Sequence, residues 1–149
     1  MYAQILIATD GSDLAARAMD QGLKLAKALG SRVTIVTVTE PAAVIGGGYA
    51  AIAGTGFDPI PELIEAQKQV ADGVLKAAAD TARAQGIEVE TILVDNSFPA
   101  EGIVASAENV GADLIVMASH GRRGLGRLLL GSQTSNVLAH SKVPVLVTR

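Results

Sequence analysis

Short apolar runs rich in β-branched residues recur along the chain, and each is bounded by Gly, Asp, Asn or Pro. Runs of this length and composition predict β-strands. Two of them, at 5–8 and 114–117, are apolar at nearly every position, which is typical of strands buried on both faces of a parallel sheet. The five predicted strands span residues 5–8, 33–38, 89–94, 114–117 and 143–147.

Between these runs, apolar residues return near the 3.6-residue spacing of an amphipathic helix. Gly30 follows the first such segment as a residue suited to ending a helix. Pro99 opens the third, where proline suits the first turn. The four predicted helices span residues 12–29, 61–85, 99–110 and 132–140.

Strands that alternate with helices predict βαβ units. The expected fold class is therefore α/β, with a five-stranded parallel sheet and helices on both faces, as in Rossmann-like proteins. The chain has 149 residues and no internal repeat, so we expect a single domain over 1–149.

One segment, 41–59, has five glycines and no convincing period. Long loops without secondary structure are uncommon in a compact domain and are often functional or disordered. Two interpretations remain open. The segment is either a mobile connection or a lid over a ligand, with Tyr49 or Phe57 as contacts.

The composition narrows the class of protein. The net charge of −3 lacks the basic excess that nucleic-acid binders usually carry, so we expect no nucleic-acid partner. No apolar stretch reaches the roughly 20 residues needed to span a bilayer, and the first residues do not resemble a signal peptide. With no cysteine for a disulfide, the expected location is the cytoplasm.

The candidate chemistry lies at 117–134, where the chain leaves the fourth predicted strand and enters the last helix. Open α/β sheets bind ligands at this edge. Glycines let a ligand approach the main chain, and the amides of such turns and of a helix start attract anions. Gly131 and Ser132 lie at the junction, where the Ser132 hydroxyl either caps the helix or binds a phosphate oxygen.

Standard phosphate-binding templates do not match this stretch. No G-x-x-x-x-G-K-[ST] motif is present, so there is no Walker-type lysine. Gly121, Gly124 and Gly126 do not follow the first strand in the spacing of a dinucleotide-binding loop.

The order of residues is more specific than the glycine count. Ala118, two residues, Gly121, nine residues and Gly131-Ser132 follow one another. Together with the opening 5–12 and the closing 143–147, this pattern resembles the ATP-binding branch of the universal stress protein family, over the full chain. That branch has glycine where this chain has Ala118, whose methyl group would crowd the sugar.

The resemblance implies a strand order of 3-2-1-4-5 and bound ATP, AMP or ADP, with Mg²⁺ or Mn²⁺ bridging the phosphates. It also implies a homodimer formed by the last strands, through Val143, Val145 and Val147. The residues agree with the dimer, because an uncovered apolar edge strand is a liability that proteins normally cover.

By resemblance, Asp10 lies beside the ribose and the phosphate–metal region, and it is an indirect metal ligand at most. Its alternative role is that of a turn or N-cap residue. The Val38 backbone would bond adenine, and Gly121 and Gly131 would cradle phosphates. The full set of expected binding residues is Ala8, Thr9, Asp10, Val38, Ala118, Ser119, His120, Gly121, Arg122, Gly131, Ser132, Gln133 and Thr134.

The expected function is a nucleotide-binding regulatory module of the stress response. Two alternatives remain: a dimeric protein-interaction module that binds no nucleotide, and a slow ATPase. Phosphoryl transfer needs a positioned base and strong charge stabilisation. His120 is the only candidate base in the loop, and a lone histidine is more often structural, so no catalytic residue is assigned.

Overall fold

The computed structural model describes residues 1–41, 60–120 and 130–149. Its sheet has five strands in the order β3-β2-β1-β4-β5, and all neighbours pair in parallel. The α/β fold class and the strand order are therefore confirmed. In chain order the elements are β1 (Gln4–Ala8), α1 (Asp13–Leu29), β2 (Arg32–Val38), α3 (Ile60–Ala84), β3 (Val89–Val94), α4 (Pro99–Val110), β4 (Leu114–Ala118), α5 (Ser132–His140) and β5 (Val145–Thr148).

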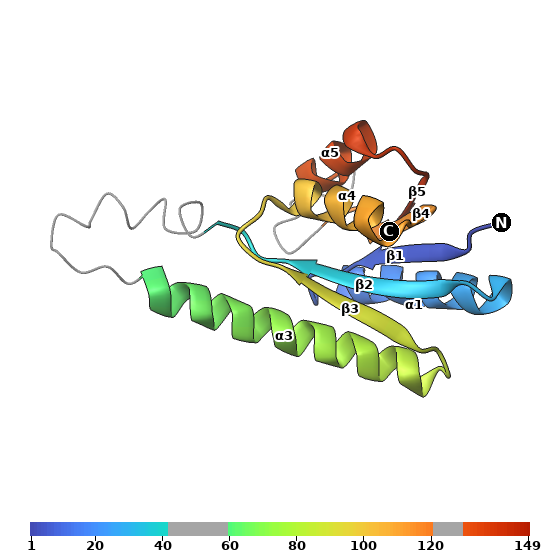
Figure 1. Cartoon of the computed structure of the whole chain (residues 1–149), viewed down its shortest axis with the longest axis horizontal. Coiled ribbons are helices and arrows are strands. Elements are labelled where there is room, and N and C mark those ends of the chain that lie inside the picture. The colour runs from blue at the N-terminus through green and yellow to red at the C-terminus, as the bar shows by residue number, and fades with distance from the viewer. Residues whose placement is uncertain (42–59, 121–129) are drawn as a thin grey trace, which may run out of the picture.

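The sheet lies between two layers of helices: α1 and α3 cover one face, and α4 and α5 cover the other (Figure 1). Alternate residues of a strand point to opposite faces. Ile5 and Ile7 of β1 accordingly join the apolar cluster under α1 and α3, while Leu6 and Ala8 join the one under α4 and α5. Every residue of β1 and β4 is buried, as their continuous apolar runs predicted.

Two glycines let helices approach the sheet closely. A Cβ at Gly22 of α1 would lie 2.8 Å from Cδ1 of Ile7, and one at Gly102 of α4 would lie 3.0 Å from the side chain of Val38. Contacts this short require the neighbouring side chains to shift in a close-packed interior. The two glycines therefore let α1 and α4 pack closely on the sheet without that rearrangement.

The helix ends follow local chemistry. Ser12 is the N-cap of α1, and its Oγ accepts a hydrogen bond from the Ala15 amide. Gly30 ends α1 with φ at 69°, in the left-handed region that favours glycine. Gly131, rather than Ser132, is the N-cap of α5, so the predicted capping role of the Ser132 hydroxyl is wrong. Ser132 is the first helical residue.

The fifth strand begins two residues later than the apolar run predicted. The Ser141 hydroxyl donates to the Val143 carbonyl at 2.7 Å and accepts from the Val143 amide at 3.1 Å. Both backbone groups of Val143 are thus occupied before the strand starts. The regular ladder begins at Val145, which pairs with Ile115 of β4.

Asp113 joins the starts of β1 and β4. Its carboxylate accepts hydrogen bonds from the Ala3 amide at 2.8 Å and from the Gln4 amide at 3.2 Å, and its own amide donates to the Gln4 carbonyl. The bond from Ala3 is the main reason why the pKa of Asp113 lies below its usual value.

Among the described helices, none combines the length and the apolar character needed to cross a membrane.

Candidate functional site

A cavity of about 660 Å³ opens where β1, β2 and β4 end. Ala8, Val38 and Ala118, the last residues of these strands, all line it. Its volume falls within the usual range for small-molecule sites, roughly 300–1,000 Å³. The carboxyl edge of the sheet, predicted as the binding edge, thus carries a cavity of suitable size.

The first turn of α5 forms the polar wall of this cavity. Gly131, Ser132, Gln133 and Thr134 all line it. The first amide of α5 to bond within the helix region is that of Ser135, which donates to the Gly131 carbonyl. Within the described residues, the amides of Ser132, Gln133 and Thr134 find no acceptor, as expected of a helix start. Three donors and the positive end of a helix dipole therefore meet the cavity.

Hydrogen bonds fix this turn against the end of β4. The Gly131 amide donates to the Ser119 carbonyl at 2.9 Å. The Thr134 hydroxyl, in a residue only 2% exposed, lies 3.0 Å from the Ala118 carbonyl and 3.1 Å from that of Ser119. The two ends of the segment 120–130 are consequently tied together beside the cavity.

Glycine at 131 is favoured by the limited room for a Cβ atom, and not by the backbone angles. Its φ of −61° suits any residue. However, a Cβ there would lie 3.2 Å from the Ser119 carbonyl oxygen and 3.4 Å from Cα of His120. A larger residue would therefore push α5 away from β4 and widen the polar wall.

Thr9 and Asp10 line the cavity just after β1. Asp10 Oδ1 accepts a hydrogen bond from the Ser12 amide at 2.9 Å, which closes a turn ahead of α1. The alternative role predicted for Asp10, that of a turn residue, is thus present. Thr9 is anchored through its carbonyl, which accepts from the Thr37 hydroxyl at 2.8 Å.

The backbone of Val38 faces the cavity side of β2. The Thr39 amide donates to the Val94 carbonyl of β3 at 2.8 Å. Successive residues of a parallel strand direct their backbone groups to opposite neighbours. The amide and carbonyl of Val38 therefore point toward β1, which has already ended at Ala8. They form a donor–acceptor pair at the rim of the cavity.

His120 lines the cavity, whereas Ser119 lies behind its wall. The Ser119 Oγ is 3.1 Å from Nδ1 of His120, and Ser119 is 2% exposed. The spacing of residue types did not identify this partner for His120. Because the serine is buried outside the cavity, the pair does not present a nucleophile to a ligand there.

Several predicted residues lie outside the described residues. Gly121 and Arg122 belong to this group, as do Tyr49 and Phe57 of the proposed lid. Of the other expected binding residues, all except Ser119 line the one cavity: Ala8, Thr9, Asp10, Val38, Ala118, His120, Gly131, Ser132, Gln133 and Thr134.

Sequence reasoning missed the apolar wall contributed by α3. Leu63, Val70 and Val74 line the cavity, as do Ile103 of α4 and Met117 of β4. The apolar spacing along this segment predicted a helix but gave no indication that part of it borders a cavity. Figure 1 shows why this was incomplete: the first turns of α3 extend past the ends of the strands.

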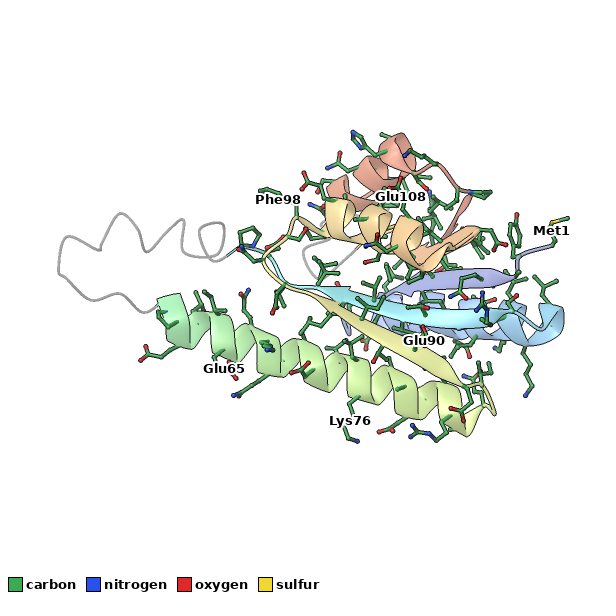
Figure 2. The ribbon with its side chains drawn as sticks, in the orientation of Figure 1. Met1, Glu65, Lys76, Glu90, Phe98 and Glu108 are labelled. Carbon is green, nitrogen blue, oxygen red and sulfur yellow. The ribbon has the colours of Figure 1, made fainter. Side chains whose placement is uncertain are left out.

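It also missed the role of the Gln133 side chain. The N-cap of α4, Phe98, makes no side-chain capping bond, and it is 50% exposed (Figure 2). The Ala100 amide in the first turn of α4 instead donates to Oε1 of Gln133 at 3.2 Å. Gln133 therefore joins the starts of α4 and α5 on the cavity side.

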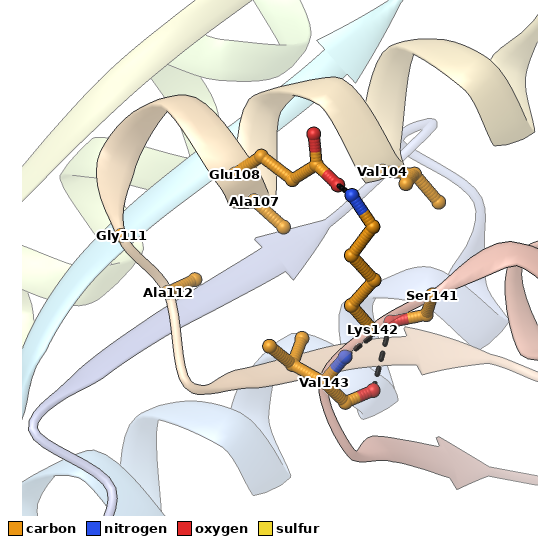
Figure 3. Close-up of a pocket in the computed structure, with 8 residues that line it drawn as sticks. All are labelled: Val104, Ala107, Glu108, Gly111, Ala112, Ser141, Lys142 and Val143. Carbon is orange, nitrogen blue, oxygen red and sulfur yellow. Dashed lines mark hydrogen bonds and ion pairs between the residues drawn. The ribbon is translucent and has the colours of Figure 1, made fainter.

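A second, smaller cavity of about 170 Å³ lies at the opposite edge of the sheet. It is lined mainly by apolar residues of α4 and of the segment before β5 (Figure 3). Glu108 and Lys142 meet beside it at 2.8 Å, and this hydrogen-bonded ion pair raises the pKa of Lys142. None of its lining residues belongs to the predicted site.

Metal binding by side chains alone has little support in the described residues. They contain no group of three or more His, Cys, Asp or Glu side chains suited to holding an ion. The large cavity has two carboxylates in its lining, those of Asp10 and Glu40. These fit a hard cation only if other oxygen ligands, such as phosphates, complete its coordination.

Comparisons with known proteins agree with this architecture. The model of the universal stress protein family matches residues 1–149. Universal stress protein YxiE of Bacillus subtilis is 34% identical over 149 residues, covering all of both chains. The solved structure of MJ0577, a universal stress protein of Methanocaldococcus jannaschii, has a TM-score of 0.81 at 30% identity and covers 99% of this chain and 96% of its own.

A further solved structure, of a universal stress protein in complex with cAMP, has a TM-score of 0.69 at 30% identity. It covers 99% of this chain and 97% of that one. With the family model matching from the first residue to the last, the chain belongs to the universal stress protein family.

Proposed function

We propose that this protein is a regulatory module that binds an adenine nucleotide, ATP in particular, in the cavity at the carboxyl edge of its sheet. The observation that carries the proposal is the first turn of α5, where three amides without acceptors in the described residues border the cavity. Such a turn favours phosphate. A similar protein in complex with cAMP supports an adenine nucleotide as the ligand class.

The phosphates and the base of the nucleotide would contact different groups in the cavity. Phosphates would lie against Gly131, Ser132 and Gln133, with His120 nearby. The base would lie toward Val38, whose amide and carbonyl suit a flat edge with one acceptor and one donor, as adenine has. The apolar side chains of α3 would cover the base.

The metal ion would enter the site bound to the phosphates of the nucleotide. Mg²⁺ and Mn²⁺ prefer oxygen ligands and keep several waters. Asp10 would contact such an ion indirectly. We therefore expect EDTA to weaken ATP binding while leaving AMP, which has a single phosphate, nearly unaffected.

Isothermal titration calorimetry with ATP, ADP and AMP tests the proposal. Binding with Kd below about 1 mM, or about −4 kcal/mol, is expected for at least one of them. Gly131→Val should abolish it, because the side chain would collide with the Ser119 carbonyl. Gly73→Ala is the control, since a Cβ there meets nothing within 4 Å.

Two results would contradict the proposal. If none of the three nucleotides binds to the wild type, the protein is an interaction module of another kind. If Gly131→Val binds as tightly as Gly73→Ala, the nucleotide lies elsewhere. Circular dichroism of both variants shows that a loss of binding is not a loss of fold.

We also propose a homodimer formed by β5, in which each subunit covers the other's free strand edge. This strand is the last in the sheet and pairs only with β4 among the described residues. Leu146 within it is 37% exposed. Sedimentation velocity that finds only monomer at micromolar concentration would disprove the dimer.

A further inference from the structure

The directions of the backbone bonds in β5 limit how two copies can pair. The Ile115 amide donates to the Pro144 carbonyl, and the Ser119 amide donates to the Thr148 carbonyl. By alternation, the even-numbered residues of β5 face β4. The amides and carbonyls of Val145 and Val147 therefore face outward, on the free edge.

The other edge of the sheet is a poorer candidate for pairing. β3 carries Glu90, an exposed charged side chain on an edge strand (Figure 2). Charges on edge strands oppose pairing with another chain. Residues 143–148 contain no charged side chain, so β5 is the edge suited to a second copy.

If a two-fold axis relates the two copies, these bond directions allow few registers for pairing one β5 with the other. In an antiparallel ladder, outward-facing residues must pair with outward-facing residues. The axis must then pass through a residue, and of the residues of β5 only Val145, Leu146 and Val147 give an axis that provides a partner for both Val145 and Val147. An axis between two residues is excluded, because it would set an outward residue against an inward one.

We infer that the axis passes through Leu146, which pairs with Leu146 of the second copy. In this register, Val145 of each copy pairs with Val147 of the other. All outward-facing amides and carbonyls of β5 then form hydrogen bonds between the two copies. An axis at Val145 would set Val147 against Val143, whose amide and carbonyl are both bonded to Ser141. An axis at Val147 would set Val145 against Arg149, which lies beyond the end of the strand at Thr148. The inference rests on the β5 dimer proposed above.

This register brings opposite charges together at the small cavity. Continued by two residues, it places Arg149 of one copy opposite Val143 of the other. Directly opposed residues point to the same face of a sheet. Val143 faces α4 and lines the cavity beside Glu108 (Figure 3). Arg149 of the second copy would thus approach Glu108, which already pairs with Lys142.

Cysteine trapping tests the register directly, because the chain has no cysteine of its own. Leu146→Cys should form an intermolecular disulfide rapidly, since facing residues of this kind lie about 4.5 Å apart between Cα atoms, within disulfide reach. Val145→Cys and Val147→Cys should cross-link more slowly, because each would face the other position rather than itself.

The outcomes separate the inference from the dimer itself. Faster trapping of Val145→Cys or Val147→Cys than of Leu146→Cys would overturn the register while leaving a β5 dimer in place. Sedimentation of the wild type as a monomer would overturn both. Nucleotide titration of the same samples tests the proposed nucleotide binding separately.

The charge contact has its own test. Arg149→Glu should raise the dimer Kd roughly two- to tenfold, since an exposed ion pair contributes little and the dimer contains two. Arg17→Glu, an exposed arginine of α1, is the control. An equal rise in both variants would show that net charge, and not contact with Glu108, is responsible.

Discussion

At the scale of single residues, the candidate site depends on small groups in fixed places. The polar wall of the large cavity is made of backbone amides, and side chains such as Thr134 only hold that backbone in position. The bond from Thr134 to two carbonyls at the end of β4 is buried. Loss of one buried partner leaves the other group unsatisfied, which costs more than the bond itself contributes.

Thr134→Val should therefore lower the free energy of unfolding by about 1–3 kcal/mol. It keeps the shape of the side chain but removes the hydroxyl that binds the Ala118 and Ser119 carbonyls. Urea unfolding followed by circular dichroism measures the change. Thr134→Ser, which keeps the hydroxyl, should lie close to the wild type. If serine and valine were equally destabilising, packing of the methyl group and not the hydrogen bonds would be the cause.

Residue types at this site were partly predictable from the sequence. Local composition marks where strands stop, and it predicted strand ends at 8 and 38 and, one residue before the observed end of β4, at 117. The choice of Ala8, Val38 and Ala118 as site residues came from the resemblance to the universal stress protein family. The bond between Gln133 and Ala100 was not predicted. It joins residues 33 positions apart, and nothing in the spacing of either helix indicates which side chain satisfies the first turn of α4.

At the scale of elements, glycines determine how closely a helix packs against the sheet. Gly22 brings α1 against β1 and β4, where the side chains of Ile7 and Val116 approach it. Gly73 is a helical glycine of the opposite kind, exposed on α3 with no atom near its missing Cβ. The same substitution should thus have opposite effects at the two positions.

Gly22→Ala should destabilise the protein by about 1–3 kcal/mol through overpacking. Gly73→Ala should stabilise it by about 0.5–1 kcal/mol, because alanine restricts the unfolded chain and favours helix. Thermal unfolding of the two variants measures both effects. A neutral Gly22→Ala variant would mean that α1 can shift outward at no cost.

A polar link between β1 and β4 should give the stability a pH dependence. Because the folded pKa of Asp113 is depressed, its contribution is present above the unfolded value near 3.8 and is lost as the pH falls through the folded pKa. Asp113→Asn should therefore lower the melting temperature at pH 7 and change it less near pH 2–3.

Asp72→Asn provides the control for that measurement, since Asp72 is an exposed carboxylate on α3. It removes the same charge without removing bonds to β1. Equal losses in Asp72→Asn and Asp113→Asn at pH 7 would refute a role for the Ala3 and Gln4 amides.

Element positions were the most predictable part of the structure. Every strand and helix that the apolar pattern predicted is present, and most boundaries agree within one or two residues. The late start of β5 has a tertiary cause, since Ser141 occupies the Val143 backbone. Likewise, the apolar spacing of α3 cannot distinguish positions that face the core from those that line a cavity, because both need the same residue types. Val70 illustrates this, being 54% exposed at the cavity wall.

At the scale of the whole molecule, the two cavities lie at opposite edges of one sheet. The large one is at the carboxyl ends of β1, β2 and β4, and the small one is at the amino ends of β4 and β5. Helix α4 borders both. A ligand at one edge and a second subunit near the other would therefore both lie close to α4.

Helix α4 connects the large cavity to the small one. Ala100 near its start is bonded to Gln133 at the large cavity, and Glu108 near its end is bonded to Lys142 at the small one. Eight residues of α-helix separate them by only about 12 Å. If a bound nucleotide shifted Gln133 and α4 moved as a rigid body, the far end of the helix beside Glu108 would move as well. Nucleotide binding at one edge and dimerisation at the other would then be linked, each altering the other's equilibrium constant by the same factor.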